Sequence, residues 1–341
     1  MFNAKNSLYT FMILSLACHL TSSKAFGFPL SIQNCDSSTV FTKAPERAVA
    51  IDINQTELML KLGLAESMIA DAGVAKKHEI LPELQAQHEN LHQLSSKYPS
   101  LEALLAIEPD FVLAGWQYGF SETTGITPER LAKMGIGTYA IRESCIRIMQ
   151  RDAVSLNDTF EDILNIGRIF AVEDRARSVV AIMRQQLSEV PALNEGERRP
   201  RVFLYDSGEK TPFTAGGFAI PTAMIHLAGG QNIFSDLPTS WANVSWEAVI
   251  EHQPELVIIV DYDEPSADEK WKFLQQKLGS HEIPALKHEN YIVLPYASAT
   301  PGIRNADAVL AISRGVQKVL RKREQTKNDK QAPYQKRIAK P

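Results

Sequence analysis

The sequence lacks the patterns by which most enzymes, metal sites and nucleic-acid-binding proteins are recognised. Its three cysteines form no Cys-x-x-Cys or Cys/His spacing, which argues against a structural zinc site. It has no phosphate-binding glycine loop, no His-Glu-x-x-His and no serine-nucleophile phrase, so catalysis has little support. A net charge of -4 gives no sign of nucleic-acid binding. We therefore predict a protein that is not an enzyme and that holds no cofactor or metal ion.

Long apolar runs are absent after the N-terminus, so no later segment is expected to span a bilayer. At the N-terminus, Lys5 precedes an apolar run that ends at Leu20, and small residues follow. This order predicts a secretory signal peptide over residues 1–25 and a location in the periplasm. Lipid anchoring through Cys18 is the alternative, but Ser15 stands where a lipoprotein signal usually has a large aliphatic residue. We favour the soluble, exported protein.

The chain contains one internal sequence repeat, called here the duplicated phrase, which occurs as Ser100–Leu113 and again as Ser245–Ile258. Serine, glutamate, alanine, proline and valine recur at the same offsets in both copies. Two copies are too few for a solenoid, so they indicate two similar lobes. The length of 341 residues, with 44% hydrophobic and 22% charged residues, suits two globular domains.

Each copy of the phrase predicts a helix that leads into a buried strand. Ser100 and Ser245 can accept a hydrogen bond from a free amide of the first turn, as N-caps do. Glu102 and Glu247 lie about 100° around the helix from the apolar face, so they should point to solvent. The proline of each copy prevents a longer helix. The continuous apolar run that follows it is typical of a parallel strand covered on both faces.

The rest of the sequence repeats the alternation of strands and helices, which predicts an α/β fold. We expect two Rossmann-like α/β sandwich lobes, residues 26–153 and 193–320, with a ligand cleft between them. A long helical pattern over residues 154–192 predicts a single long helix that joins the lobes. The last segment, residues 321–341, is polar and basic, and we expect it to be disordered; a membrane-surface role is the alternative.

Two cysteines, Cys35 and Cys145, lie beyond the predicted signal peptide. In an oxidising compartment such a pair favours a disulfide, which would tie the N-terminal segment to the end of the first lobe. Two unpaired buried thiols are the alternative.

With this organisation, the chain from Pro45 to about Leu320 resembles the class III periplasmic substrate-binding proteins of ABC importers, which serve iron-siderophores, haem and cobalamin. The resemblance implies two α/β lobes joined by one long helix, with the ligand held in the cleft between them. Shorter phrases resemble a subgroup proposed to import deazaflavin coenzyme precursors. These phrases are Gly115-Trp116, Ser207–Phe213, Trp241–Glu247 and Gly302–Asn305.

The resemblance also implies a partner, the ABC permease dimer of the inner membrane. In the family, one glutamate of each lobe docks onto arginines of the two permease subunits, and Glu102 and Glu247 occupy those positions. The alternative is that each acid only stabilises its helix through the macrodipole. We expect a monomer that delivers a small organic or metal-chelate ligand and contacts no nucleic acid. A solitary sensor or scavenger remains a further alternative.

Ligands of α/β folds bind beyond the carboxyl ends of the strands, so the residues that follow the predicted strands are the candidates. Aromatic side chains there could stack on a planar or macrocyclic ligand, and Arg142 and Arg304 could pair with a carboxylate or phosphate. For any single aromatic, packing beneath a loop is the alternative. Asp52 and Asp261 lie at the same strand exits. The candidate ligand-binding residues are Asn54, Tyr98, Trp116, Tyr118, Arg142, Glu209, Phe213, Trp241, Tyr262, Tyr296 and Arg304.

The alternative from a different class is an exported zinc or manganese receptor, or a metallo-enzyme. Such a site needs about four nitrogen, oxygen or sulfur ligands. His78, His88 and His92 cluster loosely in the sequence, but their spacing matches no recognised ligand pattern. We therefore expect no metal site.

Overall fold

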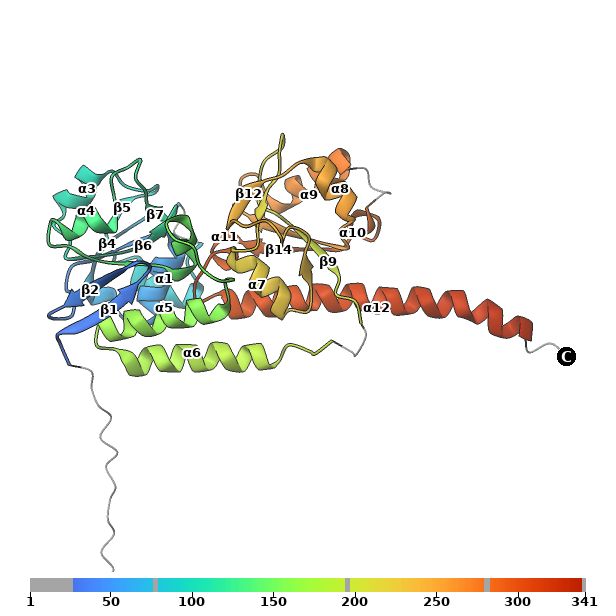
Figure 1. The fold of residues 1–341 in the computed structure, drawn as a ribbon, viewed down its shortest axis with the longest axis horizontal. Helices are drawn as coiled ribbons and strands as arrows, with labels where there is room; N and C mark the ends of the chain where they lie inside the picture. The colour runs from blue at the N-terminus through green and yellow to red at the C-terminus, as the bar shows by residue number, and fades with distance from the viewer. Residues whose placement is uncertain (1–26, 76–78, 194–196, 279–282, 339–341) are drawn as a thin grey trace, which may run out of the picture.

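The computed structural model describes residues 27–75, 79–193, 197–278 and 283–338, with side chains as far as Thr326. Two α/β lobes stand side by side above a layer of long helices (Figure 1). The predicted signal peptide and Cys18 lie outside the described residues. Within them, no helix combines the length and the apolar character that crossing a bilayer requires.

The N-terminal lobe is built on a parallel sheet with the strand order β5-β4-β3-β6-β8, and the short β7 also pairs with β6. Its strands are β3 (Ala48–Ile51), β4 (Met68–Ala72), β5 (Gln93–Ser95), β6 (Phe111–Trp116), β7 (Gly119–Phe120) and β8 (Gly137–Ala140). Its helices are α1 (Ile53–Lys61), η1 (Ala65–Ser67), α2 (Pro82–His88), α3 (Leu101–Ala106), α4 (Pro128–Ala132) and η3 (Arg142–Arg147). An antiparallel hairpin, β1 (Leu30–Asn34) and β2 (Ser37–Phe41), precedes the sheet.

The C-terminal lobe has a smaller parallel sheet with the strand order β11-β9-β13-β14. Its strands are β9 (Arg201–Tyr205), β11 (Gln231–Asn232), β13 (Leu256–Asp261) and β14 (Tyr291–Pro295), and β10 (Phe213–Ala215) pairs separately with β12 (Trp241–Asn243). Its helices are α7 (Ile220–Leu227), α8 (Trp246–His252), α9 (Ala267–Leu278), α10 (Pro284–Lys287) and α11 (Tyr296–Ala299). The predicted α/β fold with two lobes is confirmed.

The duplicated phrase forms the same unit in each lobe, α3 with β6 and α8 with β13. The Ser100 hydroxyl accepts a hydrogen bond from the Ala103 amide at 3.2 Å, and the Ser245 hydroxyl accepts one from the Ala248 amide at 3.1 Å. Both strands that follow are parallel and almost completely buried. The predicted N-caps and buried strands are therefore confirmed.

A single apolar core connects the two lobes. Side chains alternate across each strand, so Ala48 and Ala50 of β3 face the same core cluster as Val202 and Leu204 of β9. The opposite faces of the two sheets pack into separate cores, one for each lobe. The long helices beneath the sheets complete the shared core with apolar side chains. The lobes therefore meet through packed side chains as well as through the connecting chain.

The connecting segment differs from the prediction of a single long helix. It forms two helices, α5 (Leu156–Ile169) and α6 (Glu173–Ser188), which pack against each other as a hairpin (Figure 1). Gly167 permits the close approach, because a Cβ there would lie 2.4 Å from the Cβ of Ala176. Ala171 makes the turn with a φ of 56°. The apolar periodicity continues through this turn, which is why the sequence looks like one helix.

The basic tail also differs from the prediction, because it continues α12 (Asn305–Ile338) instead of being disordered. Arg323 forms an ion pair with Glu255 at 2.6 Å, and Lys322 donates to the Asn290 side chain at 2.9 Å. These contacts fix the helix past Leu320 to the C-terminal lobe. The segment beyond contains no glycine and many good helix formers, and the helix continues across Pro333 although proline removes one helical hydrogen bond.

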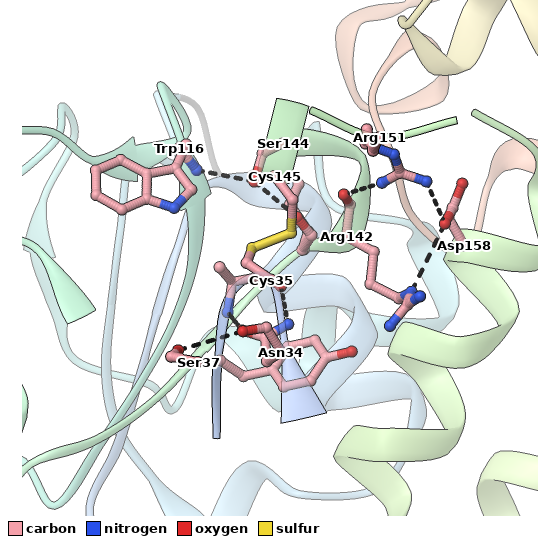
Figure 2. Close-up of a disulfide and its surroundings, with 12 residues drawn as sticks. Asn34, Cys35, Ser37, Trp116, Arg142, Ser144, Cys145, Arg151 and Asp158 are labelled. Atoms are coloured by element: carbon pink, nitrogen blue, oxygen red, sulfur yellow. Dashed lines mark hydrogen bonds and ion pairs between the residues drawn. A yellow bond between two sulfur atoms is a disulfide. The ribbon is translucent and has the colours of Figure 1, made fainter. Parts of the chain in front are cut away.

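The predicted disulfide between Cys35 and Cys145 is confirmed (Figure 2). It ties the β1–β2 hairpin to η3, on the edge of the N-terminal lobe that faces the cleft. Next to it, the Asn34 side chain exchanges two hydrogen bonds of 2.7 Å with the backbone of Ala140. The hairpin is therefore held to β8 and η3 by covalent and polar contacts together.

Replacing Cys35 and Cys145 by serine should lower the free energy of unfolding by about 4–5 kcal/mol, because the bridge closes a loop with a sequence separation of 110. Urea denaturation of the double variant and the parent protein measures the difference. A reducing agent should destabilise the parent and leave the variant unchanged. Equal stability of the two proteins under oxidising conditions would contradict this expectation.

Candidate ligand-binding cleft

Two hollows lie between the lobes, and Tyr262 and Tyr296 line both of them. The larger has a volume of about 630 Å³ and lies between the strand exits of the two sheets, with Asp52 and Tyr98 on the N-terminal side. The smaller has a volume of about 180 Å³ and contains Tyr118, Arg147, Asp206, Phe213 and Trp241. The combined space is in the range of small-molecule sites.

Asp52 lies where the larger hollow meets the N-terminal lobe. It follows β3 directly, caps α1 and is 1% exposed. Its Oδ2 accepts the hydroxyls of Tyr98 at 2.5 Å and Tyr296 at 2.8 Å, and its Oδ1 accepts the Ile53 amide at 2.7 Å. Burial raises the pKa of Asp52, and the two phenol hydrogen bonds oppose that rise. Gly73 leaves room for the ring of Tyr98 beside this carboxylate.

Asp206 is the counterpart of Asp52 in the C-terminal lobe. It follows β9 directly and is 5% exposed. Its carboxylate accepts the hydroxyls of Tyr262 and Ser207, both at 2.8 Å. Burial raises the pKa of Asp206, and these hydrogen bonds oppose the rise. Each lobe therefore places an acid after its first sheet strand, and each acid accepts a hydrogen bond from a cleft tyrosine.

Several hydrogen bonds cross between the lobes at the cleft. Besides the bond from Tyr296 to Asp52, the Trp241 indole donates to the Tyr118 hydroxyl at 2.9 Å, and Ser240 donates to Glu143 at 2.6 Å. Glu143 is 1% exposed, and burial raises its pKa to about 7 although Ser240 opposes the rise. Polar contacts therefore tie the two lobes together beside the hollows.

Seven of the eleven predicted ligand residues line the hollows. They come from both lobes and are mostly aromatic: Tyr98, Tyr118, Phe213, Trp241, Tyr262, Tyr296 and Arg304. Tyr262 and Tyr296 pack at 5.1 Å between ring centroids, and Phe213 stacks on Trp241 at 5.7 Å. The role of each in binding remains a proposal.

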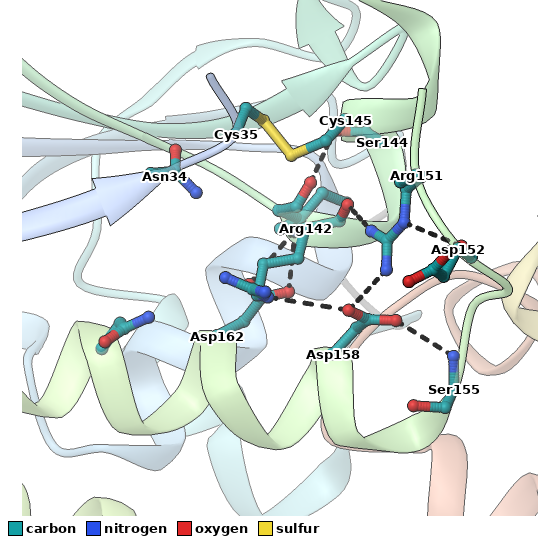
Figure 3. Close-up of polar contacts among 12 residues, drawn as sticks. Asn34, Cys35, Arg142, Ser144, Cys145, Arg151, Asp152, Ser155, Asp158 and Asp162 are labelled. Atoms are coloured by element: carbon teal, nitrogen blue, oxygen red, sulfur yellow. Dashed lines mark hydrogen bonds and ion pairs between the residues drawn. A yellow bond between two sulfur atoms is a disulfide. The ribbon is translucent and has the colours of Figure 1, made fainter. Parts of the chain in front are cut away.

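Trp116 and Arg142 do not line the hollows, contrary to the prediction. Trp116 belongs to β6, so strand alternation directs its ring into the core of the N-terminal lobe, where it packs on Phe120. Arg142 lies beside the disulfide and pairs with Asp158 of α5 at 3.6 Å (Figures 2 and 3). Arg151 shares Asp158 at 2.6 Å, so this network stabilises the start of α5.

Glu209 and Asn54 are also outside the hollows. Glu209 is exposed on the loop between β9 and β10, where its carbonyl accepts the Trp246 indole at 3.0 Å. Asn54 is buried in α1 and donates to the Pro301 carbonyl at 2.5 Å, which ties α1 to the turn before α12. Neither residue lines the hollows, because the Asn54 amide is engaged with Pro301 and the Glu209 carboxylate is exposed on its loop.

Arg304 reaches the larger hollow, but its guanidinium is already engaged. Its Nε donates to Glu57 at 2.7 Å, and Nη2 also pairs with this fully buried carboxylate and with the Glu79 carbonyl. The predicted anion contact would have to displace a buried ion pair, which is costly. Arg304 is better described as a link between α1 and the start of α12.

The sequence reasoning gave no role to Asp206, Arg147 or the Glu143–Ser240 pair. A usable signal existed for the acid, because Asp52 and Asp206 both stand directly after the first sheet strand of their lobes. No sequence signal identifies Arg147 or Glu143. They belong to η3, whose residues show no apolar periodicity that would predict a helix. Their position depends on the disulfide at Cys145.

No group of three or more His, Cys, Asp or Glu side chains in the described ranges is arranged to hold a metal ion. His88 is buried and its Nε2 lies 2.7 Å from Asp71, away from both hollows. His92 is exposed, and His78 lies outside the described residues.

Glu102 and Glu247 are both exposed in the first turns of α3 and α8, as predicted. The backbone amide of Glu102 and the Ser100 hydroxyl lower the pKa of the Glu102 carboxyl, so it is charged at neutral pH. Each lobe thus presents one solvent-facing acid at an equivalent position.

The comparisons with known proteins agree on one family. A model described as "Periplasmic binding protein" matches residues 49–297. The chain belongs to the periplasmic binding protein family. A periplasmic binding protein from Veillonella parvula dsm 2008 has 30% sequence identity and a TM-score of 0.72, with 84% of this chain and 97% of that chain covered.

Two further relatives of this periplasmic binding protein are named after the ligand that they bind. The vitamin B12-binding protein of Pectobacterium carotovorum subsp. carotovorum (strain PC1) is 27% identical over 218 residues, which are 63% of this chain and 71% of the relative. The periplasmic heme-binding protein RhuT from Roseiflexus sp. RS-1 shares the fold, with 20% identity, a TM-score of 0.63 and coverage of 81% and 99%. The family role is that of the substrate-binding component of an ABC importer.

Replacing Glu143 by glutamine should make this binding protein more stable at pH 8 by up to about 3 kcal/mol, because the pKa of Glu143 rises from 4.5 to about 7 on folding. A raised carboxyl pKa means that the native state binds the extra proton. The parent protein therefore loses stability as pH rises from about 4.5 to 7.

Urea denaturation of E143Q and the parent between pH 4 and 8 measures this difference. The exposed Glu251→Gln variant is the control and should follow the parent at every pH. Parallel stability curves for E143Q and the parent would show that Glu143 is not a buried acid of this kind.

Proposed function

We propose that this periplasmic binding protein captures a corrinoid, an iron chelate or a similar organic cofactor in the cleft and delivers it to an ABC permease. The observation that carries the proposal is the aromatic lining, to which both lobes contribute. Burial of a large ligand against such side chains supplies affinity, and a few polar groups fix its orientation. The names of the vitamin B12- and heme-binding relatives support the same ligand classes.

A thermal-shift screen tests the proposal. The panel contains cyanocobalamin, cobinamide, haemin, ferric hydroxamate chelates and deazaflavins, the last because of the subgroup resemblance. A ligand at 100 times its dissociation constant should raise the free energy of unfolding by about 2.7 kcal/mol. Tyr262→Ala, in the cleft, should lose the shift, whereas Leu227→Ala, exposed on α7, should keep it. A shift that survives in Tyr262→Ala would place the ligand elsewhere.

The competing metal receptor makes a different prediction for the purified protein. A stoichiometric zinc or manganese ion without an organic chelator, found by elemental analysis, would favour it. The arrangement of the described histidines does not support that outcome.

We propose further that Glu102 and Glu247 are the contacts to the two permease subunits. Charged groups at such rims govern orientation and association rate more than ligand affinity. The protein would act as a periplasmic monomer, because each glutamate must reach a different subunit of one permease dimer. Size-exclusion chromatography with light scattering tests the monomer.

Reversing both charges, with Glu102→Arg and Glu247→Arg, should abolish transport and leave ligand affinity in solution unchanged. Uptake by cells and calorimetry on the purified protein measure the two effects. The matched control reverses two other exposed acids, Glu129 on α4 and Glu251 on α8, and should retain transport. Normal uptake by the Glu102/Glu247 variant would exclude the docking role.

A further inference from the structure

The larger hollow offers the ligand hydrogen-bond acceptors around Asp52, and its other side-chain donors besides the phenols are Ser96, Lys97 and Arg304. A tyrosine has a single O–H group. Tyr98 and Tyr296 both donate theirs to Asp52, and Tyr262 donates its O–H to Asp206. The lone pairs of these three phenol oxygens and of the carboxylates remain available to accept further hydrogen bonds. A ligand group that reaches them must therefore supply the hydrogen.

Asp52 carries no compensating cation. In the described part of the chain, its polar partners are the two phenols and the Ile53 amide, and no lysine or arginine pairs with it. Buried charges are normally paired. Asp52 also has a φ of 90°, a strained conformation for a residue other than glycine, and such strain concentrates at functional sites.

Among the described residues, no cation near the larger hollow pairs with Asp52, although Lys270 attracts the Asp206 carboxylate. Arg304 is held by Glu57, as described above. Lys270 lies behind Tyr262, with its ammonium 4.7 Å from the ring centroid, and donates to the carbonyls of Asp206 and Val260. Lys97 is exposed at the margin.

The smaller hollow holds both kinds of group. The Tyr118 hydroxyl accepts from the Trp241 indole, so its own O–H remains available to donate. Arg147 lines the same hollow, and so does the acceptor Asp206. The cleft therefore offers acceptors around Asp52, and donors together with the Asp206 carboxylate around Tyr118.

We propose that the Asp52–Tyr98–Tyr296 and Asp206–Tyr262 clusters select the ligand by its hydrogen-bond donors. This inference rests on the proposed function and deepens it. The group bound in the larger hollow is neutral or cationic and carries amide, ammonium or hydroxyl donors. A corrinoid with its peripheral primary amides satisfies this requirement, whereas the carboxylates of haem or a catecholate chelate would face acceptors and like charge.

Two matched ligand pairs test this selection by calorimetry. Cobinamide and cobyrinic acid share the corrin ring but carry amides and carboxylates, respectively. Ferrioxamine B and its N-succinyl derivative share the iron chelate but end in an ammonium and a carboxylate. The protein should bind the donor-bearing member of at least one pair at least 100-fold more tightly, since sites built for hydrogen bonds strongly reject unmatched partners.

The double variant Asp52→Asn, Asp206→Asn should reduce this preference to below about 10-fold. An asparagine amide can donate to the phenols, which frees their O–H groups to donate to a carboxylate. Tyr98→Phe, which removes one acceptor from a partly exposed side chain, should weaken the donor-bearing ligand alone. Asp236→Asn, exposed and outside both hollows, is the control and should keep the full preference.

The possible results distinguish failure of this inference from failure of the proposed function. A preference below 100-fold in both pairs, or a preference unchanged in the double variant and in Tyr98→Phe, overturns the inference and leaves the proposed function intact. Failure of the parent protein to bind any of the four probes overturns the inference, and the proposed function falls with it when the whole thermal-shift panel also fails. Unfolding midpoints of the variants establish that each is folded during the titrations.

Discussion

The shared apolar core beneath the two sheets is the constraint on which the rest of the structure depends. One face of β3 and β6 and one face of β9 and β13 pack into the same cluster, which α5, α6 and α12 complete. Close-packed interiors deform little, so two sheets that share a core keep their relative position. The strand exits of the two lobes consequently face each other across a fixed gap, and the cleft exists before a ligand arrives.

The chemistry of the cleft follows from that fixed gap. Because Tyr296 belongs to the C-terminal lobe and Asp52 to the N-terminal lobe, their hydrogen bond needs a constant separation of the lobes. The same holds for Ser240 with Glu143 and Trp241 with Tyr118. The disulfide contributes by holding η3, which carries Glu143 and Arg147. Packing sets the geometry, and the buried acids set the polarity of the site.

Features that depend on local pattern could be predicted from the sequence. The duplicated phrase fixes α3, β6, α8 and β13, because capping serines, prolines and continuous apolar runs act over short distances. Tyr118, Tyr262 and Tyr296 could be placed because they lie just after predicted strands, and Tyr98 because it lies just before the first repeated helix. The turn at Ala171 could not, since apolar spacing continues through it and neither glycine nor proline marks it.

Features that depend on residues far away in the chain could not be predicted from the sequence. From the sequence, Arg304 and Arg142 are expected to bind a ligand anion. In the structure, Arg304 forms an ion pair with Glu57, and Arg142 forms one with Asp158. Trp116 lies at a strand exit only if β6 ends early, and its pairing with β7 carries the strand on to that residue. The basic tail stays helical because Glu255 holds Arg323. Pairing with residues far away in the chain decided these cases, except that of Trp116, which depends on the neighbouring β7.

The central claim is that the shared core fixes the lobes, so the distance between Glu102 and Glu247, the two proposed docking residues, is constant. Spin labels at cysteines substituted for Glu102 and Glu247, measured by double electron–electron resonance in the ligand-free protein, test it most directly. A single narrow distance distribution that ligand leaves in place is the result expected from the shared core. Two populations, or a shift on ligand binding larger than the label linkers allow, would contradict it.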